Sequence, residues 1–156
     1  MKNHISISMW HQMAMEGTAP PVRIVLMGNS MYPLVRYNKD YVTIAPCEGK
    51  LTIGDIVLFI DQKRKLNVVH RVWDIRDHMV LTWGDNCAHA DGWIPSELIW
   101  GKVILIERGK RNIVPNPKRG IHWAKFWHVA GKVFRWCLDI KRSVVKCIQK
   151  RKQIIR

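Results

Sequence analysis

Residues 55–75 read DIVLFIDQKRKLNVVHRVWDI, and this stretch decides the fold class. Two runs rich in β-branched residues flank a basic turn, and each run has the length of a strand rather than of a helix. Similar runs lie on both sides of it, separated by turn-forming residues. The six expected strands are VRIVLM 22–27, YVTIA 41–45, DIVLFI 55–60, NVVHRVWDI 67–75, MVLTW 79–83 and GKVILIE 101–107. We therefore expect a mainly β domain, built as a mainly antiparallel sheet or a small barrel.

The pattern changes after this domain. Apolar side chains from Trp123 to Ile148 recur at steps of three and four residues, which marks one face of a long helix. Residues 118–156 hold 12 lysines and arginines against one acidic residue, Asp139, and so +11 of the net charge of +14. The expected division is an N-terminal extension at 1–20, the β domain at 21–110, a linker at 111–120 and a basic amphipathic helical tail at 121–156.

The first chemical motif is GNSMYP at residues 28–33, directly after an expected strand. A serine on a tight turn after a strand can expose its hydroxyl at the edge of a sheet, and its backbone N–H can point at a developing oxyanion. This makes Ser30 a candidate nucleophile. Taken alone, the motif is more typical of an ordinary turn.

The second and third motifs are VVHRV at 68–72 and TWGDNCAHAD at 82–91. Strand alternation places His70 on an apolar face, where its ring needs a polar partner. Asp85, in a Gly-Asp-Asn turn, can accept backbone N–H bonds, whereas Asp91 has no such local task. An acid in this loop can orient the His70 ring and stabilise its imidazolium.

Together these motifs resemble a known superfamily. GNSMYP, LTIGDIVLF, VVHRV, TWGDN and IWGKVILI occur in the order and approximate spacing of the signal peptidase I and LexA-type serine peptidases, over residues 24–108. Bacterial signal peptidases and LexA-type proteins usually have a lysine base, whereas the endoplasmic-reticulum and archaeal branch has a histidine in an HRV motif. His70-Arg71-Val72 is similar to that histidine branch. The resemblance implies a signal-peptidase-like all-β catalytic domain and a serine endopeptidase that needs no cofactor.

The resemblance also implies roles for individual residues. Ser30 is the expected nucleophile, His70 the general base and Asp91 the acid that completes the triad, with Asp85 as a supporting or alternative acid. The expected reaction is cleavage of a signal or leader peptide through an acyl-enzyme. Because His70 acts as a base only when neutral, activity is expected to fall as the pH drops through its pKa, near 6 to 7 if that value is little shifted.

Substrate and location follow as further expectations. Met31 and Met27 are expected to line a cleft that holds a peptide or preprotein as an extended strand. The sequence shows neither a membrane-spanning stretch nor a cleavable secretory signal. The aromatic, basic tail at 121–156 is suited to an anionic membrane surface, which favours peripheral association at the cytoplasmic face. The alternative is that the apolar face of the tail packs on the β domain.

Other function classes were weighed against the peptidase. The basic tail suggests a LexA-like regulator or nucleic-acid-binding protein, but the 29 residues before Ser30 are too few for a helix-turn-helix module. No metal site is expected, because the alternating residues of the 85–91 loop match no common zinc pattern. An inactive scaffold of the same fold is the remaining alternative, and the joint presence of the three candidate triad residues argues against it.

Overall fold

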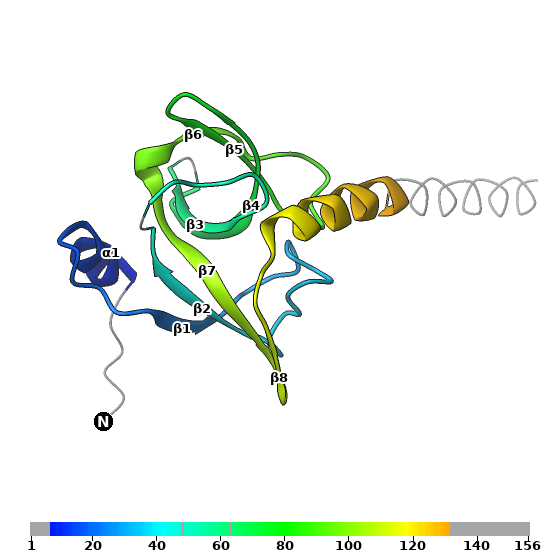
Figure 1. Cartoon of the computed structure of the whole chain (residues 1–156), viewed down its shortest axis with the longest axis horizontal. Coiled ribbons are helices and arrows are strands. Elements are labelled where there is room, and N and C mark those ends of the chain that lie inside the picture. Colours follow the sequence, from blue (N-terminus) through cyan, green and yellow to red (C-terminus); the bar gives the residue numbers. More distant parts are fainter. Residues whose placement is uncertain (1–6, 48, 63, 132–156) are drawn as a thin grey trace, which may run out of the picture.

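The computed structural model describes residues 7–47, 49–62 and 64–131, and it is mainly β with a C-terminal helix, as predicted (Figure 1). Its strands form one antiparallel sheet in the order β1-β2-β7-β3-β4-β5-β6, with β8 added beside β7. The strands are β1 Val22–Val25, β2 Tyr41–Pro46, β3 Ile56–Asp61, β4 Leu66–Arg76, β5 Met79–Trp83, β6 Gly92–Pro95, β7 Ile99–Arg108 and β8 Arg111–Ile113. All six expected strands are present, five of them with shifted ends and β5 with the expected bounds, and β6 and β8 are additional.

Among the strands of the described residues that have an unpaired edge, β1 and β4 are the two that matter for the site. Residues Leu66 to Arg71 of β4 pair with β3, and Arg71 to Arg76 pair with β5 on the other side. The first half of β4 therefore has one neighbour among the described strands, and β1 likewise pairs with β2 alone. Since neighbours in this sheet are antiparallel, β1 and β4 run in the same direction.

The N-terminal segment is part of the core. Helix α1, Ile7–Met15, inserts Trp10 into the larger apolar cluster, which also contains Ile44 and Ile106. The Trp10 indole donates a hydrogen bond of 2.7 Å to the carbonyl of Pro20. Segment 1–20, expected as an extension, therefore contributes a large buried side chain where the structure describes it.

The C-terminal helix begins at residue 117 and is described to residue 131 (Figure 1). Ile121, Ala124 and His128 are buried, whereas Trp123 and Phe126 are exposed. The side of the helix that packs against the sheet is therefore not the apolar face to which the sequence periodicity assigned Trp123 and Phe126. The expected linker at 111–120 contains β8, the short connection after it and the first turn of this helix.

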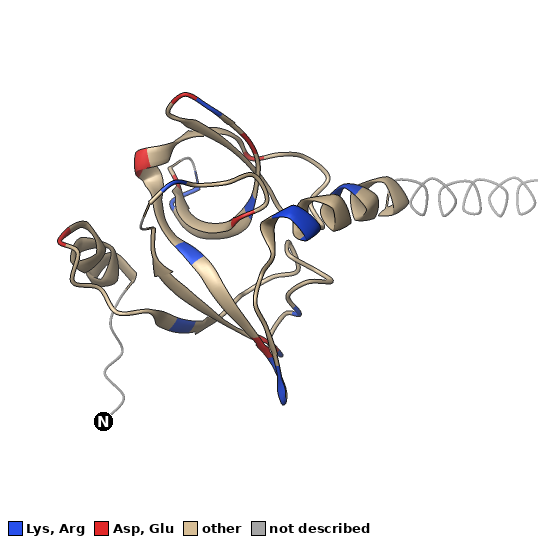
Figure 2. Cartoon of the chain, in the orientation of Figure 1, with Lys and Arg blue, Asp and Glu red and all other residues tan. Residues whose placement is uncertain are grey.

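Close packing joins the helix to the sheet. A Cβ atom on Gly120 would lie 2.5 Å from Nη1 of Arg71, and one on Gly54 would lie 2.1 Å from the carbonyl oxygen of Pro117. Figure 2 shows positive charge along the helix, whose described basic residues include Lys118, Arg119 and Lys125. The rest of the predicted tail, residues 132–156, lies outside the described residues. In the described part, no helix is both long and apolar enough to cross a bilayer.

Candidate active site

Ser30 lies on the turn that follows β1. Gly28 has a φ of 118°, which side-chain-bearing residues rarely adopt, so glycine allows the chain to turn sharply here. The backbone N–H of Asn86 donates to the carbonyl of Ser30 at 2.7 Å, and the Asn86 amide donates to the carbonyl of Asn29 at 3.1 Å. The loop between β5 and β6 thus fixes the turn that carries the candidate nucleophile.

His70 and Asp91 form a direct pair. Nδ1 of His70 lies 2.6 Å from Oδ2 of Asp91, and both side chains are largely buried. The hydroxyl of Thr82 donates to the same carboxylate oxygen at 2.9 Å, and the N–H of Asp91 donates to the carbonyl of Thr82 at 3.0 Å. Asp91 is therefore held in place and in turn fixes the orientation of the His70 ring, a contact that an acid and a base also make in nucleophile-base-acid sites.

Gly84 separates the histidine from the serine turn. A Cβ atom on Gly84 would lie 2.8 Å from Nε2 of His70 and 2.9 Å from the carbonyl oxygen of Ser30. Nε2 of His70, the nitrogen not bonded to Asp91, and the backbone of Ser30 therefore approach each other across this glycine. The structure describes no hydrogen bond between the Ser30 hydroxyl and His70, and such bonds often tighten only when substrate is bound.

Cys87 is the other neighbour of the histidine. Its Sγ lies 4.0 Å from Nε2 of His70, and the thiol is free. Burial alone would lower the pKa of His70, but the hydrogen bond to Asp91 and the contact with Cys87 outweigh it and raise this pKa to about 9. This pKa lies above the range of 6 to 7 expected for a histidine whose pKa is little shifted. The sequence pattern did not show how closely Asp91 and Cys87 approach the ring.

Asp85 has a different partner. Its two carboxylate oxygens accept hydrogen bonds of 2.8 and 2.7 Å from Nε and Nη2 of Arg71, and both side chains are buried. Nη1 of Arg71 donates to the carbonyl of Gly54 at 2.9 Å. The structure therefore brings Asp91, and not Asp85, to His70, and Asp85 instead anchors the Arg71 side chain against which the C-terminal helix packs.

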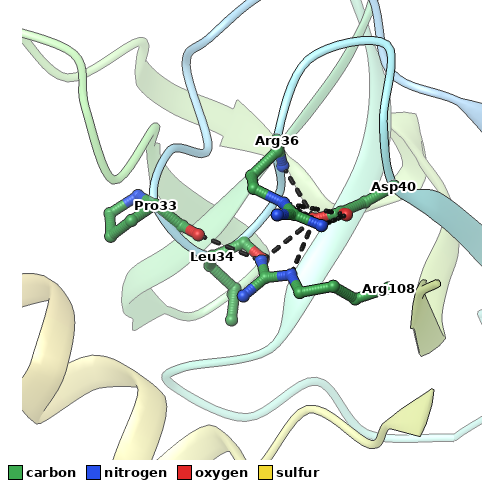
Figure 3. A network of polar contacts seen from close by, with 5 residues as sticks. All are labelled: Pro33, Leu34, Arg36, Asp40 and Arg108. Atoms are coloured by element: carbon green, nitrogen blue, oxygen red, sulfur yellow. Dashed lines mark hydrogen bonds and ion pairs between the residues drawn. The ribbon is translucent and has the colours of Figure 1, made fainter. Parts of the chain in front are cut away.

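The segment after Ser30 is anchored by an ionic network around the buried Asp40 (Figure 3). Asp40 accepts hydrogen bonds from Arg36 and Arg108, and Arg108 also donates to the carbonyls of Pro33 and Leu34. Burial opposes ionisation of Asp40, but the bonds to the two arginines outweigh it and lower its pKa to about 2. This network, which the sequence did not reveal, fixes the path of the chain just beyond Ser30.

A cleft of about 470 Å³ opens beside Ser30 and His70. Residues around β1 line one side and the first half of β4 lines the other, so the unpaired edges of both strands face the cleft. Met31 is buried at its wall and Met27 is exposed at its rim, so both residues expected to line the substrate cleft do line this one.

Neither models of known protein families nor curated proteins match this chain. Within the described ranges, no three His, Cys, Asp or Glu side chains are grouped to hold a metal ion. A function for this chain therefore rests on its sequence motifs and on the geometry of the site.

Three contributors to the site were missed by the sequence analysis, namely Thr82, Arg71 as the partner of Asp85, and the Asp40 network. Thr82 carried one usable signal, because it lies at the end of an expected strand that leads into the acidic loop. Arg71 and Asp85 are 14 positions apart in the sequence, and Asp40 and Arg108 are 68 positions apart. Strand periodicity alone does not show that such distant residues form ion pairs.

Proposed function

We propose that the protein is a serine endopeptidase of the signal peptidase I type, in the branch with a histidine base, and that it cleaves signal or leader peptides. One observation carries the proposal. Asp91 holds Nδ1 of His70, so that Nε2 on the other side of the ring approaches the Ser30 turn across Gly84, at the end of an open cleft. A base oriented by an acid beside a serine turn is the arrangement that nucleophilic acyl transfer requires.

In the proposed mechanism, Nε2 of neutral His70 accepts the proton from Oγ of Ser30 while Oγ attacks the peptide carbonyl. The imidazolium, stabilised by the Asp91 carboxylate, then gives this proton to the leaving amine, and the C–N bond breaks to leave an ester on Ser30. Water, deprotonated by His70, attacks the ester, and the proton returns to Oγ as the acid product leaves.

The oxyanion needs a hydrogen-bond donor close to the nucleophile. The structure describes no acceptor for the backbone N–H of Ser30. The carbonyl of the same residue already accepts a hydrogen bond from the N–H of Asn86. This N–H is therefore available to a negatively charged oxygen formed at the carbonyl that Ser30 attacks, and such a donor contributes to lowering the barrier of acyl transfer.

The shape of the cleft supports a peptide as the substrate. The unpaired edges of β1 and the first half of β4 run in the same direction on its two sides. An extended chain placed between them can hydrogen-bond to exposed backbone groups, the mode known as β-strand addition. Since the lining is largely apolar, we expect mainly apolar substrate side chains in the cleft.

An exposed aromatic surface supports peripheral association with an anionic membrane at the cytoplasmic face. Its members are Tyr32, Trp123, Phe126 and Trp127, with ring centroids 5.8 to 6.5 Å apart in successive contacts. Aromatic side chains beside basic residues on one helix suit the headgroup region of anionic lipid. Because Tyr32 is two residues from Ser30, a membrane bound there would lie near the active site.

A cleavage assay tests this function. We expect purified protein to cleave leader-type peptides, Ser30→Ala and His70→Ala each to lower kcat at least about 10³-fold, and anionic vesicles to raise the rate. Ser96→Ala and the exposed His89→Ala are matched controls that should retain cleavage. Cleavage that survives Ser30→Ala would refute the mechanism, and absence of cleavage by every form would refute the peptidase.

A further inference from the structure

Arg64 lies in the hairpin between β3 and β4, at the end of the cleft remote from the catalytic pair. His70 is at one end of the unpaired stretch of β4, Leu66 is at the other, and Arg64 precedes Leu66 by two residues. The Arg64 side chain lines the cleft while remaining 72% exposed to solvent. A guanidinium is thus placed where an extended substrate would leave the apolar part of the cleft.

The charge of Arg64 is distinctive among the described residues of the lining. Apart from His70, the others are apolar or neutral, and none is a carboxylate. Asp61 contacts the arginine from the hairpin itself, through an ion pair of 3.6 Å to Nε and a hydrogen bond of 3.1 Å from the Arg64 N–H. Such a long, exposed ion pair neutralises the guanidinium only weakly.

We propose that Arg64 determines specificity by selecting a substrate with an acidic side chain about four to six residues from the scissile bond. The inference rests on the proposed peptidase function. It follows from strand geometry, because Arg64 lies six positions before His70 and an extended substrate beside β4 advances about 3.3 Å per residue, as β4 itself does. The turn shortens the path slightly, which gives the lower end of the range.

The neighbouring Lys65 supplies a matched control. It carries the same charge in the same hairpin and is also exposed, but it does not line the cleft. A general attraction between a basic protein and acidic peptides would respond equally to loss of either charge. A contact inside the cleft would respond to loss of Arg64 alone.

The experiment uses the full chain and pairs of synthetic peptides with an alanine-rich centre. Mass spectrometry first locates the cleaved bond, and each pair then differs by Glu or Gln at one position, moved outward on both sides of that bond. We expect kcat/KM for the Glu peptide to exceed that of its Gln partner by about two- to fivefold at the matching position, the size of an exposed ion pair. Arg64→Gln should abolish this preference and Arg64→Glu should reverse it, whereas Lys65→Gln should retain it.

The outcomes separate this inference from the proposed function. Equal rates for Glu and Gln at every position, or equal loss of the preference in Arg64→Gln and Lys65→Gln, would overturn the role of Arg64 while leaving the peptidase intact. Anisotropy of labelled peptides on the Ser30→Ala variant gives a second readout. If no form cleaves but this variant binds Glu peptides more tightly through Arg64, the peptidase fails and the acidic selection stands. Absence of both effects overturns both.

Discussion

At the scale of single residues, the environment of His70 decides how the site can work. The ring is held by Asp91 on one nitrogen, and the other nitrogen faces Cys87 and the serine turn. The motif spacing singled out His70 and an acid in the 82–91 loop, and the structure brings Asp91 of that loop to the ring. Which of the two acids meets the ring is set by the path of the loop, and that path depends on the Arg71 contact of Asp85.

The raised pKa of His70 predicts an alkaline pH profile. With a pKa of about 9, the ring is mostly protonated at neutral pH, so kcat/KM should rise with pH, reach half of its plateau near pH 9 and level off above about pH 10. Cys87→Ala removes one contact that raises this pKa and should move the curve to lower pH. A curve flat from about pH 5 to 9 would contradict a histidine base with this environment.

The same shift affects folding. Because the folded pKa lies above the unfolded value of 6.5, the Asp91 contact stabilises the fold fully below about pH 6.5, and this contribution is lost as the pH rises through about 9. The form proposed to be active, with neutral His70, is thus the one in which this contact stabilises the fold least.

At the scale of elements, the loop from β1 to β2 depends on Asp40. This carboxylate is buried and links Arg36 and Arg108, and Arg108 in turn donates to the backbone carbonyls of Pro33 and Leu34 beyond Ser30. The strands around this loop were predictable because their β-branched runs are long and bounded by turn residues. Strands β6 and β8 were not, since four and three residues are too few to show alternation.

Asp40→Asn should lower the free energy of unfolding at pH 7 by about 2 kcal/mol, because it removes the charged acceptor of the hydrogen bonds from Arg36 and Arg108. Urea unfolding measures the change. Since the pKa of Asp40 falls from 3.8 unfolded to about 2 folded, the wild type should also lose about 2 kcal/mol of this contribution as the pH drops from above 4 to below 2. Asp74→Asn, at a partly exposed ion pair, is the control and should cost less than about 1 kcal/mol. Equal losses in both variants would contradict the anchoring role.

At the scale of the whole molecule, both α-helices of the described residues, α1 and the C-terminal helix, pack against the β domain. Trp10 fills the core from α1, and the C-terminal helix packs through Ile121 and Ala124. The sequence predicted that helix from its periodicity but not the side that packs, because its aromatic residues are suited to either a core or an interface. The contact is set by Gly120 and Arg71, a pair that no local pattern connects.

The central claim is that His70 activates Ser30, and labelling with a fluorophosphonate probe tests it without knowledge of the substrate. Mass spectrometry of the labelled chain should place the adduct on Ser30. The labelling rate should rise with pH toward 9, and labelling should be lost in His70→Ala and retained in His89→Ala. An adduct on another serine, or unchanged labelling of Ser30 in His70→Ala, would contradict the account.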